Sequence, residues 1–215
     1  MLKRLMLLLI ATIAMRAEAA SDDALVTLAE GKVTGTVGGQ AVLAFSRLKE
    51  GQIVSLGKDA RLRIVYFANG RQEIWGGPGK LEIGGTGGKA TGLRDMGVVQ
   101  LPDVLVRQMA KTPVEGGQGR AGMTRLRGIV SPSAIAAVED TYRQLRSSSA
   151  ADDLNPEMYA LSSWLELRAF PRVEQMIGEL RAHRPADAQA SQLADLYERT
   201  LREQTLRENS EAAPR

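Results

Sequence analysis

Residues 61–75 read RLRIVYFANGRQEIW, and their pattern indicates the fold class of the first half of the chain. Polar and apolar side chains alternate through RLRIVY, so the alternate residues from Leu62 to Tyr66 share one face of an extended strand. Asn69-Gly70 then separates this run from a second strand-like run, and the dipeptide favours the positive φ values of a type I′ turn. The stretch therefore predicts a β-hairpin in a sheet with one buried face.

Similar short alternating runs lie on both sides of the hairpin, separated by glycine-rich turns. They are ALVTLA (24–29), KVTGTVG (32–38), QAVLAF (40–45), QIVSL (52–56), KLEI (80–83) and MTRLRG (123–128). The pattern is typical of antiparallel sheets and predicts an all-β domain over residues 24–127. Within that range, PDVLVRQMAKT (102–112) predicts one short helix, and VEGGQGRAG (114–122) predicts a loop.

After Gly128 the hydrophobic period becomes helical. Ser131-Pro132 and Asn155-Pro156 are typical helix starts, with proline at the first helical position. The apolar stripes contain Ile135, Val138, Tyr142 and Leu145; Met158, Leu161, Trp164 and Leu165; Val173, Met176, Ile177 and Leu180; and Leu193, Leu196, Tyr197 and Leu201. Because short links favour antiparallel neighbours, we expect a small antiparallel helical segment over residues 131–206. A charged, disordered tail is expected over residues 207–215. The predicted fold class is therefore α+β, with the two parts as separate domains.

The composition excludes most metal-ion and nucleophile chemistry, although a catalytic pair of carboxylates is not excluded by spacing. Cysteine is absent and there is one histidine, which excludes thiolate sites and the usual multi-histidine metal sites. GGTGGKAT (84–91) lacks the spacing and hydroxyl of a phosphate-binding loop, and we interpret it as a turn-rich loop. Asp153, Asn155 and Glu157 alternate as in a calcium loop but lack its glycine, which favours helix capping. We therefore expect no catalytic residue, metal or cofactor.

The first nineteen residues have the pattern of a signal peptide. Lys3 and Arg4 precede an apolar run over residues 5–15, and Ala17 and Ala19 are the small residues that a signal peptidase recognises. The run is shorter than the roughly 20 residues that a membrane-spanning helix needs. We expect a periplasmic or secreted mature chain without a transmembrane span; a retained N-terminal anchor is the alternative.

Charge divides the remaining chain into two unlike halves. Residues 20–130 contain 15 Lys and Arg against 10 Asp and Glu, whereas residues 131–215 contain 10 against 14. A net charge of +5 over the first half is too small for a nucleic-acid interface. We therefore expect no nucleic-acid partner.

Residues 47–83, RLKEGQIVSLGKDARLRIVYFANGRQEIWGGPGKLEI, resemble the FecR-type periplasmic domain of ferric-citrate signal transducers and other exported proteins. The residues that carry the resemblance are Gly51, Gly57, Asp59, Phe67, Asn69, Gly70, Leu81 and Ile83. The resemblance implies a roll or solenoid of short strands that contacts other macromolecules. Ferric-citrate signalling is not expected, because only four residues precede the apolar run where those transducers have a cytoplasmic segment.

Residues 164–185, WLELRAFPRVEQMIGELRAHRP, resemble the middle and end of a tetratricopeptide repeat (TPR). Trp164 matches the aromatic position of the first helix, Phe170 the turn and Pro185 the terminator. Val173 and Leu161 depart from the small residues that the family pattern has at these positions. The resemblance implies a helical hairpin that offers a groove to protein partners.

We expect a non-catalytic adaptor or structural component of the bacterial envelope, with other envelope proteins as partners. Tyr159, Ser163 and Arg168 fall beside the apolar stripe of their helix and are the candidate exposed partner-binding residues. The alternative is a module that binds peptidoglycan or an anionic polysaccharide through the β-domain. Its candidate residues are Trp75, beside a possible open edge, and the outer-face arginines Arg61, Arg63 and Arg71.

The signal-peptide pattern makes a direct prediction about the mature protein. N-terminal sequencing of protein from the native host should begin at Ala20 or within a residue or two of it, because cleavage follows the small residue Ala19. An intact Met1 on soluble cytoplasmic protein would contradict both the signal peptide and the envelope location.

Overall fold

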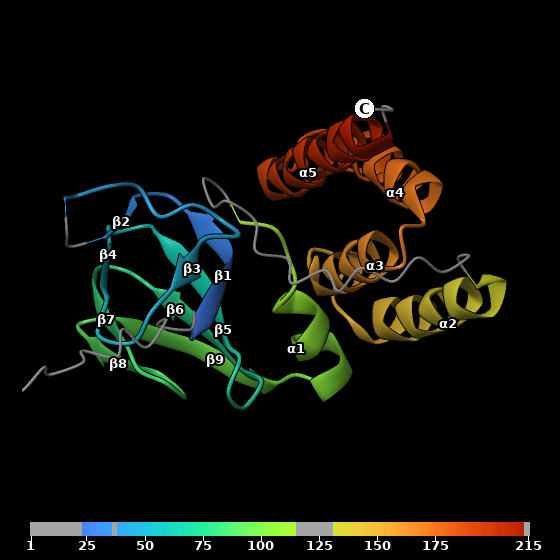
Figure 1. Cartoon of the computed structure of the whole chain (residues 1–215). Helices are drawn as coiled ribbons and strands as arrows, with labels where there is room; N and C mark the ends of the chain where they lie inside the picture. The colour runs from blue at the N-terminus through green and yellow to red at the C-terminus, as the bar shows by residue number, and fades with distance from the viewer. Residues whose placement is uncertain (1–22, 36–37, 115–130, 213–215) are drawn as a thin grey trace, which may run out of the picture.

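The structure, a computed structural model, describes residues 23–35, 38–114 and 131–212, with side chains described up to residue 206. Figure 1 shows a β-rich region beside a group of helices. The predicted signal peptide and the MTRLRG run lie outside the described residues.

The β region consists of two antiparallel sheets. Five strands form sheet A in the order β3-β1-β5-β6-β9, and four form sheet B in the order β2-β4-β7-β8. The strands are β1 (Ala24–Glu30), β2 (Val33–Gly35), β3 (Arg47–Leu48), β4 (Ile53–Leu56), β5 (Arg61–Tyr66), β6 (Arg71–Gly76), β7 (Gly79–Ile83), β8 (Gly88–Thr91) and β9 (Arg94–Gln100). The described residues show neither a closed barrel nor a solenoid.

Two stretches of this region form a different secondary structure from the one predicted. The QAVLAF run, residues 40–45, forms only an isolated bridge at Ala41, because the chain turns at Phe45, whose φ is +65°. The GGTGGKAT loop contains strand β8. The glycines of this stretch are typical of loops, so the strand was not predicted. Gly88 is required in the strand, because a Cβ added there would lie 2.5 Å from a methyl group of Leu81. Strand β9 was not predicted at all.

Strands β5 and β6 form the predicted hairpin, with Val65 opposite Gln72. The connection is a four-residue loop, 67–70, in which Gly70 alone has a positive φ, +69°. A type I′ turn needs two such residues, so the predicted turn type is wrong. The side-chain oxygen of Asn69 instead accepts a hydrogen bond from the backbone N–H of Arg71 at 3.0 Å, and this contact stabilises the loop.

Strand β5 is buried on both faces, not on one as predicted. Leu62 and Ile64 belong to the core between the two sheets. Val65 points the other way and belongs to a second core, which it shares with Leu25 of β1 and with the helices. The pleat of one strand therefore supplies side chains to two cores.

The helices are α1 (Asp103–Met109), α2 (Pro132–Ser148), α3 (Asn155–Glu166), α4 (Phe170–His183) and α5 (Ala188–Ala212). The predicted short helix and the predicted helices of the second half are confirmed. Consecutive helices from α2 to α5 pack against each other, and α1 packs on α3. The backbone of α5 is helical to Ala212, where we expected an irregular tail from residue 207.

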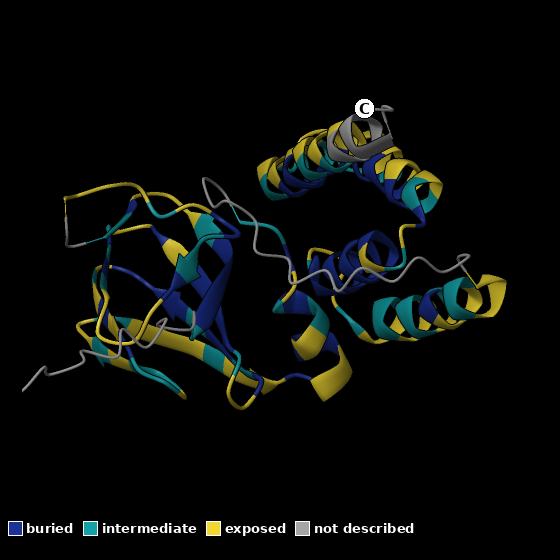
Figure 2. Cartoon of the chain, in the orientation of Figure 1, coloured by how far each residue is buried: buried dark blue, intermediate teal, exposed yellow. Residues whose placement is uncertain are grey.

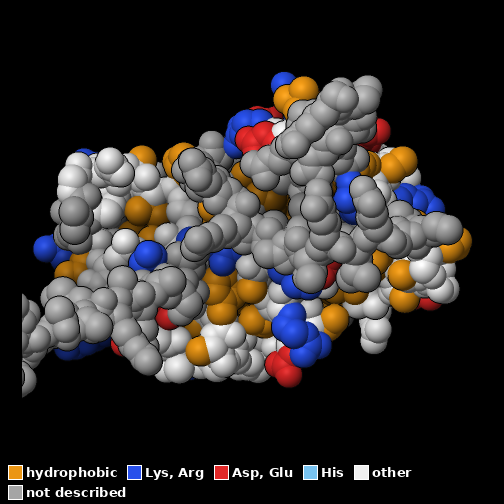
Figure 3. Space-filling view, in the orientation of Figure 1, with side chains coloured by type: hydrophobic (Ala, Val, Ile, Leu, Met, Phe, Trp, Pro, Cys, Tyr) orange, Lys and Arg blue, Asp and Glu red, His pale blue; other side chains and the backbone are white. Residues whose placement is uncertain are grey.

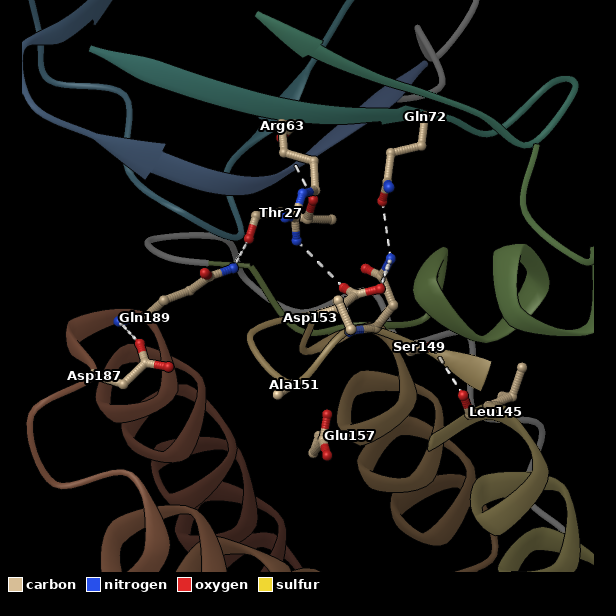
Figure 4. Close-up of polar contacts among 12 residues, drawn as sticks. Thr27, Arg63, Gln72, Leu145, Ser149, Ala151, Asp153, Glu157, Asp187 and Gln189 are labelled. Atoms are coloured by element: carbon tan, nitrogen blue, oxygen red, sulfur yellow. Dashed lines mark hydrogen bonds and ion pairs between the residues drawn. The ribbon is translucent and has the colours of Figure 1, made fainter. Parts of the chain in front are cut away.

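Polar contacts join sheet A to the helices at a surface that we call the seam (Figure 4). Arg63 of β5 pairs with Asp153, just before α3, at 3.3 Å. The side-chain amide of Asn155 donates to the Gln72 side chain at 2.8 Å. Gln189 at the start of α5 donates to the backbone oxygen of Thr27 (Figure 4).

The seam bears on the predicted division into domains. Its apolar core contains Leu25, Phe45 and Val65 from the β region together with side chains of α1 to α5. The predicted boundary, near residue 128, lies outside the described residues. Independent folding of the two ranges stays a prediction, but the sheet and the helices bury apolar surface against each other.

The seam ion pair should contribute to stability. Arg63→Met keeps the apolar stem but leaves the partly buried Asp153 carboxylate without its cation, so it should lower the free energy of unfolding by about 2 kcal/mol. Arg61→Met removes an exposed ion pair with Glu30 and should cost less than about 1 kcal/mol. Urea unfolding followed by circular dichroism gives both values. Equal effects would mean that the seam pair is no more important than a surface contact.

Candidate functional site

A pocket of about 230 Å³ lies where α2, α3 and α4 meet. We call it the helical groove. Its lining residues are Glu139, Tyr142 and Arg143 of α2, Trp164 of α3, and Arg172, Gln175, Met176 and Glu179 of α4. Its lining combines aromatic, apolar and charged side chains.

Apolar and aromatic side chains make the inner wall of the groove. Trp164 and Met176 are buried members of the helical core. Tyr142 packs against Trp164 with ring centroids 6.4 Å apart and an interplanar angle of 59°, a tilted arrangement that aromatic rings favour. These residues come from the apolar stripes of three helices, so the packing of those helices sets the shape of the wall.

Charged side chains line the mouth of the groove and are largely paired. Arg172 of α4 lies 2.7 Å from Glu139 of α2, which joins the two helices across the groove. Gln175 donates to Glu179 at 2.9 Å along α4. The groove therefore offers both signs of charge, and a strongly acidic or basic partner gains no general attraction from it.

A buried carboxylate holds the groove tyrosine in place. The hydroxyl of Tyr142 donates to Glu157 at 3.2 Å, and Arg146 donates to both oxygens of the same carboxylate at 3.1 Å. Burial, and then the negative charge of Glu157, raise the pKa of Tyr142 to about 12. The phenol is thus neutral and oriented at physiological pH.

The residues that resembled a calcium loop lie at the start of α3. The carboxylate of Asp153 accepts the backbone N–H of Asn155, the first residue of α3, at 3.1 Å. The N-cap residue of α3 is Leu154, which makes no side-chain cap hydrogen bond, so the predicted capping is not found in its usual form. Asp153 lies one residue before the N-cap and satisfies a backbone donor that has no partner within the helix.

The predicted partner-binding residues of α3 do not line the groove. We expected Tyr159 and Ser163 to be exposed, but only 5% and 3% of their surface is accessible. The cause is that α3 packs against α1, α2, α4 and α5 and is buried from Asn155 to Leu165, so it has no free face. Arg168 is exposed in the turn after α3, and its guanidinium carbon lies 5.9 Å from the ring centroid of Phe170.

The candidate residues of the β-domain do not share a surface. Trp75 is 9% exposed, and its indole N–H donates to the buried Glu73 carboxylate at 3.0 Å. The pleat separates the arginines, which we expected on one outer face. Arg63 faces the helices at the seam, whereas Arg71 pairs with Glu73 at 2.6 Å on the other side of sheet A. Arg61 is exposed and lies 3.6 Å from Glu30.

The sequence contained a signal for the groove that we did not use. Polar residues on α2 and α4 recur three or four positions apart beside the apolar stripes, as with Glu139 and Arg143 or Gln175 and Glu179. Such spacing places them on one face of each helix. In the structure these two faces lie toward each other across α3. This arrangement depends on how the helices pack, and residue spacing along a single helix gives no information about packing.

The Tyr142–Glu157 contact predicts a specific pH dependence. Tyrosine has an ordinary pKa of 10.0, so the raised pKa lets the folded chain keep this proton to higher pH than the unfolded chain. The stabilising contribution is complete below pH 10 and is lost as the pH rises from 10 to about 12. Wild type should therefore exceed Tyr142→Phe in unfolding free energy by a constant amount below pH 10. The gap should narrow above it, and a constant gap to pH 12 would contradict the assignment.

No protein-family model, curated protein or solved structure matches this chain. The resemblances to FecR-type domains and to tetratricopeptide repeats therefore stay interpretations of the sequence. Among the described helices, none combines the length and the apolar character needed to cross a membrane. The described residues also contain no group of three or more His, Asp and Glu side chains placed to hold a metal ion.

Proposed function

We propose that this protein is a non-catalytic adaptor of the bacterial envelope, which binds a segment of a partner protein in the helical groove. The observation that carries the proposal is the groove itself, with an aromatic and apolar inner wall and a paired, charged mouth. Protein interfaces are built in this way, with an apolar centre and a polar rim.

The size of the groove favours a protein partner over a small molecule. Pockets for small ligands have volumes of about 300–1,000 Å³. A pocket of about 230 Å³ is smaller, and it suits one or two side chains of a longer segment. Tyr142, which is half-buried and packs against the buried Trp164, would contact an apolar or aromatic side chain of that segment, while Arg143 and Glu179 would meet flanking polar residues.

The sequence supplies the rest of the proposal. The signal-peptide pattern supports a periplasmic or secreted location. The FecR-like and TPR-like patterns support a β-module and a helical module that both contact macromolecules. On the face drawn in Figure 3, Lys and Arg side chains form small separate groups and no continuous basic surface, which agrees with protein partners better than with a polyanion.

Carbohydrate binding through the β-domain is the alternative function. The buried indole of Trp75 and the opposite orientations of Arg63 and Arg71 give it less support, because sugar-binding surfaces need accessible side chains on one face. The binding experiment described next can distinguish carbohydrate binding from the adaptor function.

Two variants test the adaptor proposal. Arg143→Ala with Gln175→Ala removes two exposed side chains from opposite walls of the groove and should lower recovery of partner proteins from envelope extract about tenfold or more. Gln144→Ala with Glu174→Ala changes neighbouring exposed residues of the same helices that do not line the groove, and it should retain the partners. Melting curves should stay close to wild type for both, since no apolar core residue is changed.

The outcomes separate the two functions. Mass spectrometry should identify proteins that wild type and the control retain and the groove variant loses. Equal retention by the two variants would overturn the role of the groove. If purified peptidoglycan sediments wild type and Arg61→Ala abolishes this, while the groove variant still binds, carbohydrate binding replaces the adaptor function.

A further inference from the structure

Strand β9 is an open edge of sheet A. Its only neighbour among the described strands is β6, and it has seven residues. The other edge strands are shorter, with two residues in β3, three in β2 and four in β8. Figure 2 shows β9 as exposed along almost its whole length. In the described part of the protein, β9 is therefore the longest strand edge that is available for pairing.

The register shows which backbone groups of β9 face outward. Leu101 donates its N–H to the oxygen of Gly70 at 3.0 Å, so the backbone N–H of Leu101 points toward β6. Residues whose backbone groups point toward the partner strand alternate along an antiparallel ladder. Val99, opposite Gln72, therefore also bonds toward β6, while the N–H and C=O groups of Val98 and Gln100 point to the open edge.

The side chains of this edge are unusually apolar for an unprotected strand. Val98 is 43% exposed and Val99 is 47% exposed, and Met96 is exposed beside them. Native proteins normally protect such edges with charges, proline or bulges. Here the bulge and the charged residues Arg94 and Asp95 occupy only the first part of the strand, and residues 97–100 carry neither charge nor proline.

We propose that β9 pairs with β9 of a second copy of this chain, antiparallel and centred on Val98. A two-fold axis at this position makes Val98 a hydrogen-bonded pair with its own counterpart, using backbone groups that face outward. It also places Met96 beside Gln100 of the second copy. The pairing extends sheet A from one molecule into the next.

Charge and symmetry favour a second copy as the occupant. Residues 97–100 are uncharged, so no charged side chains face each other at the centre of the pairing. The antiparallel arrangement also brings Arg94 of one copy toward Asp103 in the first turn of the other copy's α1. Asp95 is already bonded to the backbone N–H of Gly97 at 2.9 Å on its own chain. Because the opposite edge of sheet A is the two-residue β3, the pairing closes as a dimer and does not continue into a fibre.

A charge-pair experiment tests the dimer. Sedimentation velocity of the purified chain over a dilution series should show dimers that dissociate on dilution, since pairing through one strand buries a small area. Val98→Lys and Val98→Glu each place like charges opposite each other and should weaken dimerisation at least about tenfold. An equimolar mixture of the two variants should restore the dimer, which also shows that both are folded.

The matched control is Leu43→Lys, which adds the same charge at an exposed apolar residue outside β9 and should dimerise like wild type. A wild-type chain that stays monomeric at every concentration would overturn the proposal. So would equal effects of Leu43→Lys and Val98→Lys, or a mixture of the two Val98 variants that remains monomeric. Groove binding does not enter this experiment, so its result is independent of the adaptor function.

Discussion

The architecture depends on the burial of β5 on both faces. One face of this strand closes the space between the two sheets, and the other carries Val65 into the core that the helices share. A strand with a single buried face would remove Val65 from the apolar surface that it forms with Leu25 and Phe45 against the helices. The same strand also places Arg63 at the seam, where it pairs with Asp153. The position of the helical region relative to the sheets follows from this arrangement.

The helical groove follows from a comparable constraint on α3. Since α3 contacts four other helices, it has no face left for solvent, and its residues serve the core. The surface available for binding is therefore supplied mainly by its neighbours α2 and α4, with Trp164 alone contributed by α3. The Glu139–Arg172 ion pair and the Tyr142–Glu157 hydrogen bond fix the relative positions of these helices at the groove.

The two proposed interaction surfaces use different physical means. The groove offers side chains of mixed character around a concave centre, which gives selectivity for a particular segment. The β9 edge offers a regular array of backbone groups, with which any strand of suitable register can pair. Its uncharged centre favours partner strands that are also uncharged there. The two surfaces lie on different elements, the groove on α2, α3 and α4 and the edge on β9.

Sequence patterns predicted most of the order of strands and helices, the hairpin at Asn69-Gly70, the helix starts at the prolines and the lack of cysteine chemistry. These features depend on local periodicity and backbone preference, which a short window of residues contains. The patterns did not reveal β8, because glycines that allow close packing of Gly88 against Leu81 look like loop residues.

Which surfaces are exposed depends on how distant parts of the chain pack together. Tyr159 and Ser163 lie off the apolar stripe of α3, yet they are buried because helices cover every side of it. Arg61, Arg63 and Arg71 appear equivalent in the sequence, but the pleat and the docked helices give each a different environment. Burial is set by what packs on a face from distant parts of the chain, and local spacing carries no information about that.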